Sequence, residues 1–453
     1  MLYGTYNMRK YYKSLLNIAI PVSLQSLIQA SLNMIDQFMI GRLGSEAIAS
    51  VGLGSKGLFI LLFVIAGIGG GASIFISQYW GKQDRDKIGQ VIGITLISGG
   101  IITTLFFLLS FAVPQYFIGL FTTDPVIISS GAKYLKLISP GYFPLLMITT
   151  WSASLRSTGH TKLPMYGGLI SVAVNTVLNY LFIFGFAFIP AMGIEGAAIA
   201  TTTARFIEAA IILTTVYMKR LPGSVSIREM TGISLPFARL FAATSIPLVL
   251  TEFIWVLGDS AFSAIYGRIG TDELAAMTIT GPIQMLTIGL LTGVSTAAAV
   301  ILGNELGADN KERASRYAIR FILIGIALTL FLGLLVIFFS KFYVSIYNVS
   351  DNVADASVKI LLIFGIILWV KVTNMILGNG VLRSGGDTRF VLMMDSAGMW
   401  LIGVPAGIIA AFVLKLPFPV VYILVTVEEI IRMIFMLFRT RSGKWLNNLV
   451  EEI

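Results

Sequence analysis

Apolar residues form long runs along the chain, and short polar connections separate these runs. A hydrophobic run of about 20 residues is long enough to cross a bilayer as an α-helix. The pattern therefore predicts an all-α polytopic membrane protein with twelve transmembrane helices. We expect these helices at 15–39, 51–80, 88–112, 134–155, 163–187, 194–218, 241–266, 275–303, 317–340, 358–381, 390–414 and 418–438.

The second half of the sequence repeats the first half at a shift of 226 residues. The pair Ile20 and Pro21 aligns with Ile246 and Pro247. After one inserted residue, the five residues that begin at Leu155 align with the five that begin at Leu382. Each copy holds six of the predicted spans, so both copies cross the membrane in the same orientation. Such repeats are typical of transporters whose site lies between the repeats.

The repeat predicts two homologous six-helix lobes at 1–218 and 241–453, joined by a linker at 219–240. Lys and Arg number 21 in the termini and connections on the side of this linker, and 7 on the opposite side. Cytoplasmic loops carry an excess of Lys and Arg. We therefore expect both termini in the cytoplasm and the protein, as a monomer, in the inner (cytoplasmic) membrane.

The composition excludes several classes of protein. The chain is 56% hydrophobic and only 12% charged, against roughly 25% charged in soluble domains. It has no cysteine and a single histidine, His160, so thiolate sites and a histidine-built centre are excluded within one chain. No Gly-Lys-Ser/Thr sequence follows the glycine-rich runs, which argues against an ATP-driven pump. The net charge of +9 arises in short loops and indicates topology, not nucleic-acid binding.

The first span carries a polar stripe. At 100° per residue, Gln25, Gln29, Asn33 and Asp36 fall within an arc of about 80°. Such a face avoids lipid, so it lines a cavity or packs against a polar partner. Ionisable groups inside membranes mark functional sites, and Asp36 is a candidate to bind H+ or Na+. Its position near the outer end of the span also fits a carboxylate solvated among headgroups.

The seventh span carries Glu252, Asp259 and Ser263 on one face, with Trp255 beside them. Both carboxyls are candidates to bind H+ or Na+. A permanently protonated, hydrogen-bonded structural carboxyl is the alternative for Glu252. The repeat aligns Asn33 with Asp259, whereas Glu252 has no acidic counterpart in the other copy. The acidic residues are therefore distributed asymmetrically between the copies.

Other polar residues occur inside the predicted spans. Lys371 in the tenth span needs a carboxylate partner, for which Asp36, Glu252 and Asp259 are candidates, or an aqueous cavity; snorkelling or a structural ion pair are alternatives. Glu428 and Arg432 have the spacing of an intrahelical pair, which leaves Glu429 over, and Arg205 and Glu208 are one turn apart. The residues that we expect to line a substrate cleft between the lobes are Gln25, Gln29, Asn33, Asn175, Asn179, Trp255, Lys371 and Asn374.

Four ordered motifs give the chain a family resemblance. The segment Leu155–Lys162 and its repeat Leu382–Arg389 are the strongest, followed by Asn175–Gly185 and Gly193–Thr201. With these motifs the chain resembles the multidrug and toxic compound extrusion family over nearly its whole length. The resemblance implies twelve helices in two lobes and the export of organic cations in exchange for Na+ or H+.

The resemblance also assigns candidate roles. Asp36 is similar to the acidic residue in the family's first helix, and Glu252 to the seventh-helix glutamate of its bacterial branch. Asn179 stands where one subgroup has aspartate, and Lys371 lies near the place of a tenth-helix aspartate in sodium-coupled members. The coupling ion is therefore left open, with Na+ an alternative to H+ at Asp36, Glu252 or Asp259.

The expected function is secondary active multidrug export, with small organic cations and the lipid bilayer as partners and no cofactor besides the coupling ion. The main alternative is a flippase for lipids or lipid-linked oligosaccharides. A membrane-embedded enzyme would need clustered catalytic groups at one depth, and the sequence offers none. A passive channel fits poorly with a duplicated chain that holds single, asymmetric acidic residues.

Overall fold

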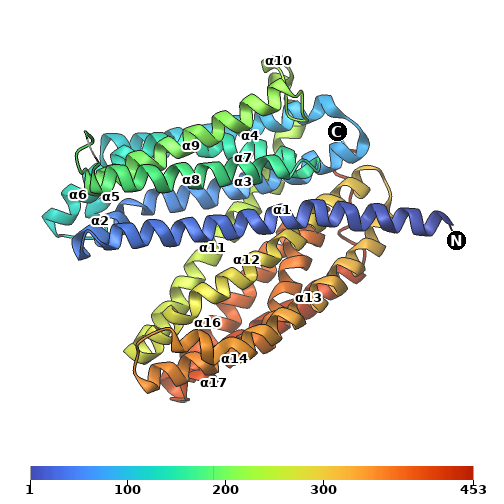
Figure 1. Cartoon of the computed structure of the whole chain (residues 1–453). Coiled ribbons are helices and arrows are strands. Elements are labelled where there is room, and N and C mark those ends of the chain that lie inside the picture. Colours follow the sequence, from blue (N-terminus) through green and yellow to red (C-terminus); the bar gives the residue numbers. More distant parts are fainter. Residues whose placement is uncertain (1, 187, 452–453) are drawn as a thin grey trace. The chain divides into compact units, whose positions relative to one another are not determined.

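A computed structural model describes residues 2–186 and 188–451, and their secondary structure is almost entirely helical (Figure 1). Residues 1, 187, 452 and 453 lie outside the described residues; they include both chain ends and the expected end of the fifth span. In the described part, the only strand-like pairing is one isolated bridge between Phe186 and Ile189.

The chain forms two compact units, which are described separately. Unit 1 comprises the chain up to Ser23 and from Ile246 onward, and unit 2 comprises Leu24–Ser245. The boundaries fall inside two long helices, α1 (Leu2–Gly41) and α11 (Leu235–Ile269), close to the repeat-related Pro21 and Pro247. The units thus exchange the first parts of these helices, whereas the sequence predicted lobes separated by the linker.

Unit 2 contains the helices between these two boundaries. After the second part of α1 come α2 (Ser45–Gly54), α3 (Lys56–Lys82), α4 (Arg85–Ala112), α5 (Pro114–Gly119), α6 (Pro125–Ile138), η1 (Ser139–Gly141), α7 (Tyr142–Ser157), α8 (Lys162–Phe184), α9 (Gly193–Met218), α10 (Ile227–Thr231) and the first part of α11. Side-chain caps begin several of them: Asp84 accepts a hydrogen bond from the Lys87 amide, and Asp124 from the Val126 amide.

Unit 1 contains the first part of α1 and the remainder of the chain. Its helices are the second part of α11, α12 (Thr271–Gly307), α13 (Lys311–Ser345), α14 (Asp351–Met375), η2 (Ile376–Leu382), α15 (Thr388–Ala397), η3 (Gly398–Gly403), α16 (Val404–Ile408), η4 (Ile409–Val413) and α17 (Phe418–Arg441). The segments η2, η3 and η4 are wider π-helical turns.

All twelve predicted spans coincide with helical segments. In the described residues, ten segments are long and apolar enough to cross a membrane. The other two predicted spans, the fourth and the twelfth, differ from these ten in physical features that the structure shows. The fourth is interrupted by the 3₁₀ turn η1 at Pro140, and α17 carries Glu428, Glu429 and Arg432 at its centre.

The repeat recurs in the backbone at the helix ends. Gln83 after α3 and Asp309 after α12 both adopt a left-handed conformation, with φ of 66° and 56°. Gly159 and Gly386, which are equivalent positions within the two copies of the strongest motif, have φ of 82° and 77°. Equivalent turns therefore follow equivalent helices in the two copies, and glycine suits the second pair because it tolerates positive φ without strain.

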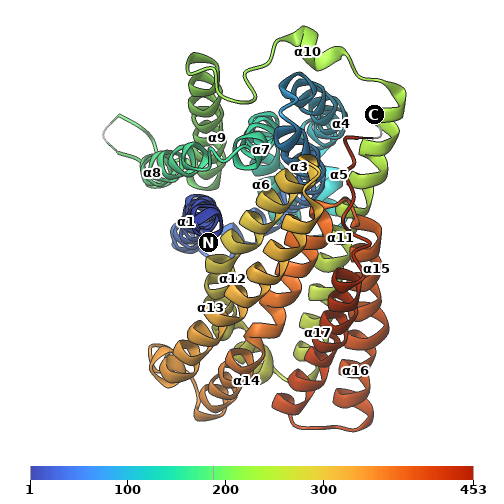
Figure 2. The ribbon, with the colours of Figure 1, turned by 90° about the vertical axis from the view of Figure 1, so that its right-hand side faces the viewer.

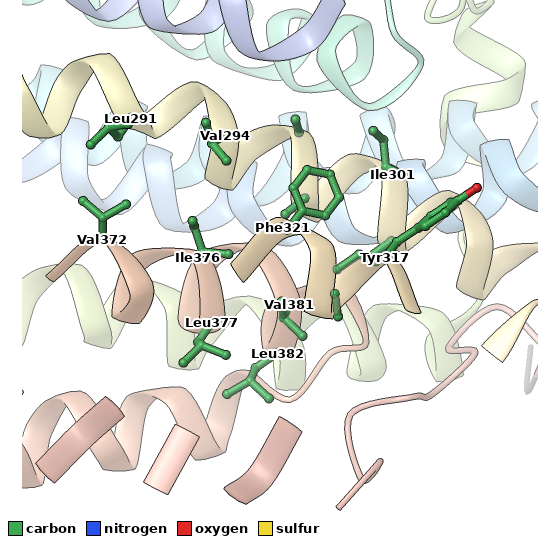
Figure 3. Close-up of a cluster of buried hydrophobic side chains, with 14 of the residues drawn as sticks. Leu291, Val294, Ile301, Tyr317, Phe321, Val372, Ile376, Leu377, Val381 and Leu382 are labelled. Carbon is green, nitrogen blue, oxygen red and sulfur yellow. The ribbon is translucent and has the colours of Figure 1, made fainter. Parts of the chain in front are cut away.

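The first part of α1 packs inside unit 1. Ser23 donates a hydrogen bond from its hydroxyl to the carbonyl of Leu290 at 2.5 Å, and the Tyr11 ring lies 4.5 Å from that of Tyr317. Tyr317 belongs to a buried apolar cluster that joins α12, α13 and η2 (Figure 3). These contacts are mostly apolar or between small groups, so the close approach of the helices is what stabilises the packing of α1 in unit 1.

Gly293 in α12 is where this approach is tightest, and Gly293→Ala is expected to destabilise unit 1. A Cβ at this position would overlap the carbonyl oxygen of Ala19 and the hydroxyl oxygen of Ser23. Backbone cannot rotate away as a side chain can, so we expect a loss of about 1–3 kcal/mol. Thermal unfolding of the purified protein in detergent measures this loss.

Gly281 in the same helix provides the control, because a Cβ there would meet no atom within 4 Å. Gly281→Ala should unfold at the wild-type temperature or slightly above it, since alanine favours helix. Equal melting temperatures for the two variants would show that α1 and α12 are not in close contact.

The connection between α9 and α11 is attached to unit 2 (Figure 2). The Trp151 indole donates a hydrogen bond to the Gly223 carbonyl at 3.1 Å, and the short helix α10 packs on α4. A Cβ on Gly93 of α4 would overlap the Met230 carbonyl, so the approach is close. A capping box joins Ser226 and Glu229 and lowers the pKa of the Glu229 carboxyl, which accepts hydrogen bonds from the backbone and hydroxyl of Ser226. The expected linker is therefore an ordered part of unit 2.

Candidate functional site

Asp36 in α1 is hydrogen-bonded inside unit 2. The Asn179 amide donates to Asp36 Oδ1 at 2.6 Å and to Asn175 Oδ1 at 3.0 Å. Asn175 in turn donates to the Thr201 hydroxyl at 3.2 Å. Asn175 and Asn179 are 2% and 1% exposed. A chain of amides thus holds one oxygen of the carboxylate in place.

The spacing in the sequence accounts for this geometry. Asn175 and Asn179 lie four residues apart on α8, so their side chains project from one face of that helix. That face packs on α9, which supplies Thr201, and receives Asp36 from α1. Asp36, from the expected polar face of the first span, therefore meets a polar face of the fifth.

Oxygen atoms remain available around the carboxylate. Asn179 Oδ1 is buried and has no hydrogen-bond partner among the described residues, and neither has Nη1 of Arg205 on α9. The Arg205 guanidinium lies close enough to influence Asp36 electrostatically. Hard cations prefer oxygen ligands. A carboxylate beside a free amide oxygen has the chemistry to take up a proton or a small cation.

The rest of the polar stripe on α1 has different surroundings. Gln25 donates from its amide to the Pro164 carbonyl at 3.4 Å. Gln29 and Asn33 are exposed within unit 2. Within the part of the chain that the structure describes, Gln25 and Asp36 are therefore the two of these four residues that hydrogen bonds fix to unit 2.

Unit 1 contains a cavity of about 410 Å³. Asp259 and Trp255 from α11 line it, together with Tyr266 from the same helix and Gln284 from α12. Asp259 is exposed in this structure, and Trp255 is 49% exposed. The cavity thus combines aromatic surfaces with an accessible carboxylate, a combination that suits an organic cation.

Glu252 does not line this cavity. It forms an ion pair with Arg383 at 3.7 Å. Arg383 belongs to the repeated motif that begins at Leu382. The two acidic residues that the sequence places on one face of the seventh span thus have different surroundings: Glu252 is paired with Arg383, whereas Asp259 lines the cavity.

Lys371 has a different partner from those that the sequence suggested. Its ammonium lies 3.1 Å from Glu429 Oε1, and Asn374 donates to Glu429 Oε2 at 2.8 Å. Arg432 also contacts Glu429, and it lies 3.0 Å from Asp395 Oδ1. Glu429, which the sequence left without a partner, is therefore the carboxylate between two cations.

We call Lys371, Asp395, Glu428, Glu429 and Arg432 the charge cluster. Asp395 is the member that sequence reasoning missed. It lies in the predicted eleventh span, and a single acidic residue within an apolar run was the signal that could have identified it. In the described residues, no group of three or more His, Asp or Glu side chains is arranged to hold a metal ion.

The fold and these polar sites define a class: a duplicated, polytopic α-helical membrane protein with ionisable groups inside the apolar helices of both units. The sequence model of the MatE family matches residues 21–181 and again 247–409. The chain belongs to the MatE family, as the resemblance predicted, and it is a membrane transporter, not an enzyme. The double match also confirms the internal repeat.

Curated relatives cover nearly the whole chain. A probable multidrug resistance protein NorM of Thermotoga maritima is 25% identical over 96% of this chain and 93% of its own length. An uncharacterized transporter YisQ of Bacillus subtilis is 23% identical over 96% and 95%. A multidrug resistance protein MdtK of Yersinia enterocolitica is 23% identical over 88% of each chain.

Solved structures share the fold. An outward-facing multidrug resistance MATE transporter has a TM-score of 0.86 at 19% identity, over 96% of this chain and 97% of the other. A transporter of the MOP superfamily from Pyrococcus furiosus has a TM-score of 0.85 at 19% identity, over 96% of each chain. The predicted fold class of twelve helices in two homologous six-helix lobes is therefore confirmed.

Proposed function

We propose that this protein is a secondary active multidrug exporter that exchanges organic cations for Na+ or H+ across the cytoplasmic membrane, with both termini in the cytoplasm. The observation that carries the proposal is the hydrogen-bonded arrangement of the partly buried Asp36 carboxylate with the buried amides of Asn179 and Asn175. Multidrug resistance relatives along the whole chain support it. The protein acts as a monomer, and it needs no cofactor besides the coupling ion.

In this mechanism the coupling ion binds at Asp36 from the outside and the organic cation leaves. Ion binding and substrate binding oppose one another, and linkage makes the opposition reciprocal. A coupling free energy of about 1–3 kcal/mol corresponds to a change in affinity of about 5–150-fold. Binding of the ion at one site thus releases the substrate, and binding of the substrate releases the ion.

Efflux from proteoliposomes tests the function. The purified protein is reconstituted with a fluorescent organic cation inside, and a Na+ gradient or a pH gradient is imposed separately. Stimulation by one gradient identifies the ion. A protein that is folded but responds to neither gradient, while it moves labelled lipid between leaflets, would be a flippase and not an exporter.

Asp259 is proposed to attract the positive charge of the substrate in the unit 1 cavity. Asp259→Asn is expected to raise the half-saturating concentration of an organic cation by about tenfold, the equivalent of about 1.4 kcal/mol. Transport of a neutral amphipathic compound should change little, because the lost interaction is with charge. Concentration series of both compounds in the efflux assay measure this difference.

Asp272→Asn is the matched control, since Asp272 is an exposed carboxylate at the start of α12. It should leave both concentration series unchanged. An equal loss for the charged and neutral compounds in Asp259→Asn would mean that Asp259 shapes the cavity but does not attract the cation.

A further inference from the structure

The charge cluster of unit 1 contains more carboxylates than cations. Lys371 and Arg432 provide two positive charges, whereas Asp395, Glu428 and Glu429 provide three negative charges when all are ionised. All five come from α14, α15 and α17. The cluster therefore keeps one negative charge that no cation within it balances.

The neighbouring groups do not supply the missing cation. Arg383 is within electrostatic reach of Asp395 but is paired with Glu252 of α11. The cavity adds the Asp259 carboxylate and the phenols of Tyr266 and Tyr422. The segments η3, α16 and η4 contain no ionisable side chain, and Gln284 is the polar side chain that α12 directs to Tyr422. The surroundings are neutral or negative.

Glu428 is the carboxyl that the cluster satisfies least. Its nearest cation atom is Arg432 Nε, 3.9 Å from Glu428 Oε2, which is beyond hydrogen-bond distance. Glu428 Oε2 is buried and accepts no hydrogen bond from the described residues. The whole residue is only 3% exposed, so solvent does not replace the missing hydrogen bond. Glu429, in contrast, receives hydrogen bonds from Lys371 and Asn374. A buried carboxylate without a hydrogen bond is costly, and neutralisation by a proton removes that cost.

The backbone beside Glu428 makes room for its carboxyl group. The π-helical turn η3 begins at Gly398 and ends at Gly403. A Cβ on Gly398 would lie 2.7 Å from Glu428 Oε2, and one on Gly403 would lie 3.1 Å from Glu428 Cγ. Single π-helical turns inside helices occur frequently at functional sites. Glycine at both ends of this turn leaves Glu428 in contact with backbone and with the cavity that it lines.

We infer that Glu428 is a proton-binding site of unit 1, a second cation site separate from Asp36 in unit 2. The Glu428 carboxylate accepts H+ from the cavity and becomes a neutral carboxyl group, which brings the charge cluster to neutrality. Release of the proton restores the excess negative charge beside Lys371 and Arg432. The inference deepens the proposed exporter function and rests on it only for its consequence in transport.

Infrared difference spectroscopy of the purified protein in lipid tests the site without transport. Spectra at acidic minus alkaline pH should show a carbonyl band of a protonated carboxyl group, and Glu428→Gln should remove the part that belongs to Glu428. Glutamine has the size of the protonated acid, so the variant should fold. Gly398→Ala keeps the carboxyl but presses on Oε2, and it should shift the frequency or the pH midpoint of the same band.

Glu46→Gln is the matched control, because Glu46 is an exposed carboxyl at the start of α2. It should leave the band of the buried carboxyl group unchanged. An unchanged buried-carboxyl band in Glu428→Gln, together with no effect of Gly398→Ala, would overturn the inference.

Efflux assays separate the site from the function. In an exporter, Glu428→Gln should alter the response to a pH gradient and leave the binding of Na+ at Asp36 intact. If the Glu428 band titrates but the protein shows no gradient-driven export, the proton site stands and the exporter function is refuted. Export that persists unchanged in a variant without the band would refute a role of Glu428 in coupling.

Discussion

Asp36→Asn is expected to reduce gradient-driven efflux to the level of protein-free liposomes while unit 2 stays folded. The asparagine carbonyl can still accept the hydrogen bond that Asn179 donates at 2.6 Å, so the amide chain through Asn175 to Thr201 is retained. The negative charge that would bind H+ or Na+ is lost. Efflux rates under each gradient, with melting temperatures measured in parallel, check both parts.

Linkage gives a second readout for the same variant. In the wild type, a saturating concentration of the coupling ion should weaken substrate binding by about 5–150-fold. In Asp36→Asn the substrate affinity should lose the part of this dependence that arises from ion binding at Asp36, because the variant has no charge there to bind the ion. Asp272→Asn should behave as the wild type. Substrate affinity that still responds fully to the ion in Asp36→Asn would place coupling at another carboxyl.

Glu429→Gln is expected to be the most destabilising neutral replacement in unit 1. Glu429 contacts Lys371 at 3.1 Å and also contacts Arg432, and it accepts a hydrogen bond from Asn374. Removal of one partner from a buried ion pair costs about 3–5 kcal/mol, because the remaining charge has no solvent. Here two cations lose their shared carboxylate. Denaturation of the purified protein in detergent measures the loss.

An exposed ion pair provides the comparison. Lys359 and Asp355 are 2.6 Å apart on α14, with side chains 53% and 64% exposed. Surface pairs contribute about 0–1 kcal/mol, so Asp355→Asn should change stability little. If Glu429→Gln were no worse than Asp355→Asn, the remaining surroundings of Lys371 and Arg432, including Asp395 beside Arg432, would be enough to compensate both cations.

The sequence predicted the helices well because a membrane imposes a length on every apolar run. The repeat added the two-lobe arrangement, since Pro21 recurs as Pro247 at a shift of 226 residues and Gly159 recurs as Gly386 one residue further on. The family followed from ordered motifs of this kind. None of these inferences required knowledge of which helices are in contact.

Partners across helices could not be predicted in the same way. Periodicity places Glu428 and Arg432 on one face of α17 but gives no information about a neighbouring helix. Lys371 on α14 is 58 residues from Glu429, and Asp395 is 37 residues from Arg432. Because of these separations in sequence, the charge cluster could not be predicted, although every member was an ionisable residue in an apolar run.

The boundaries of the compact units were also hidden. A linker rich in charge and proline is the usual sign of a domain boundary, and residues 219–240 have that composition. The structure places the boundaries within helices instead, because the first parts of α1 and α11 find their apolar partners in the opposite copy. No local sequence pattern predicts the ring contacts of Tyr11 with Tyr317 or of Phe237 with Phe75.

Because the units exchange the first parts of α1 and α11, a break in the linker between the two sequence copies would not separate the compact units. A chain cut between Gly232 and Ile233 would give two polypeptides, yet neither would correspond to one compact unit. The first would supply residues up to Ser23 to unit 1, and the second would supply α11 up to Ser245 to unit 2, where Phe237 and Phe241 are 1% and 2% exposed. Each polypeptide thus completes the other's core. We therefore expect the two halves to hold together without a peptide bond between them.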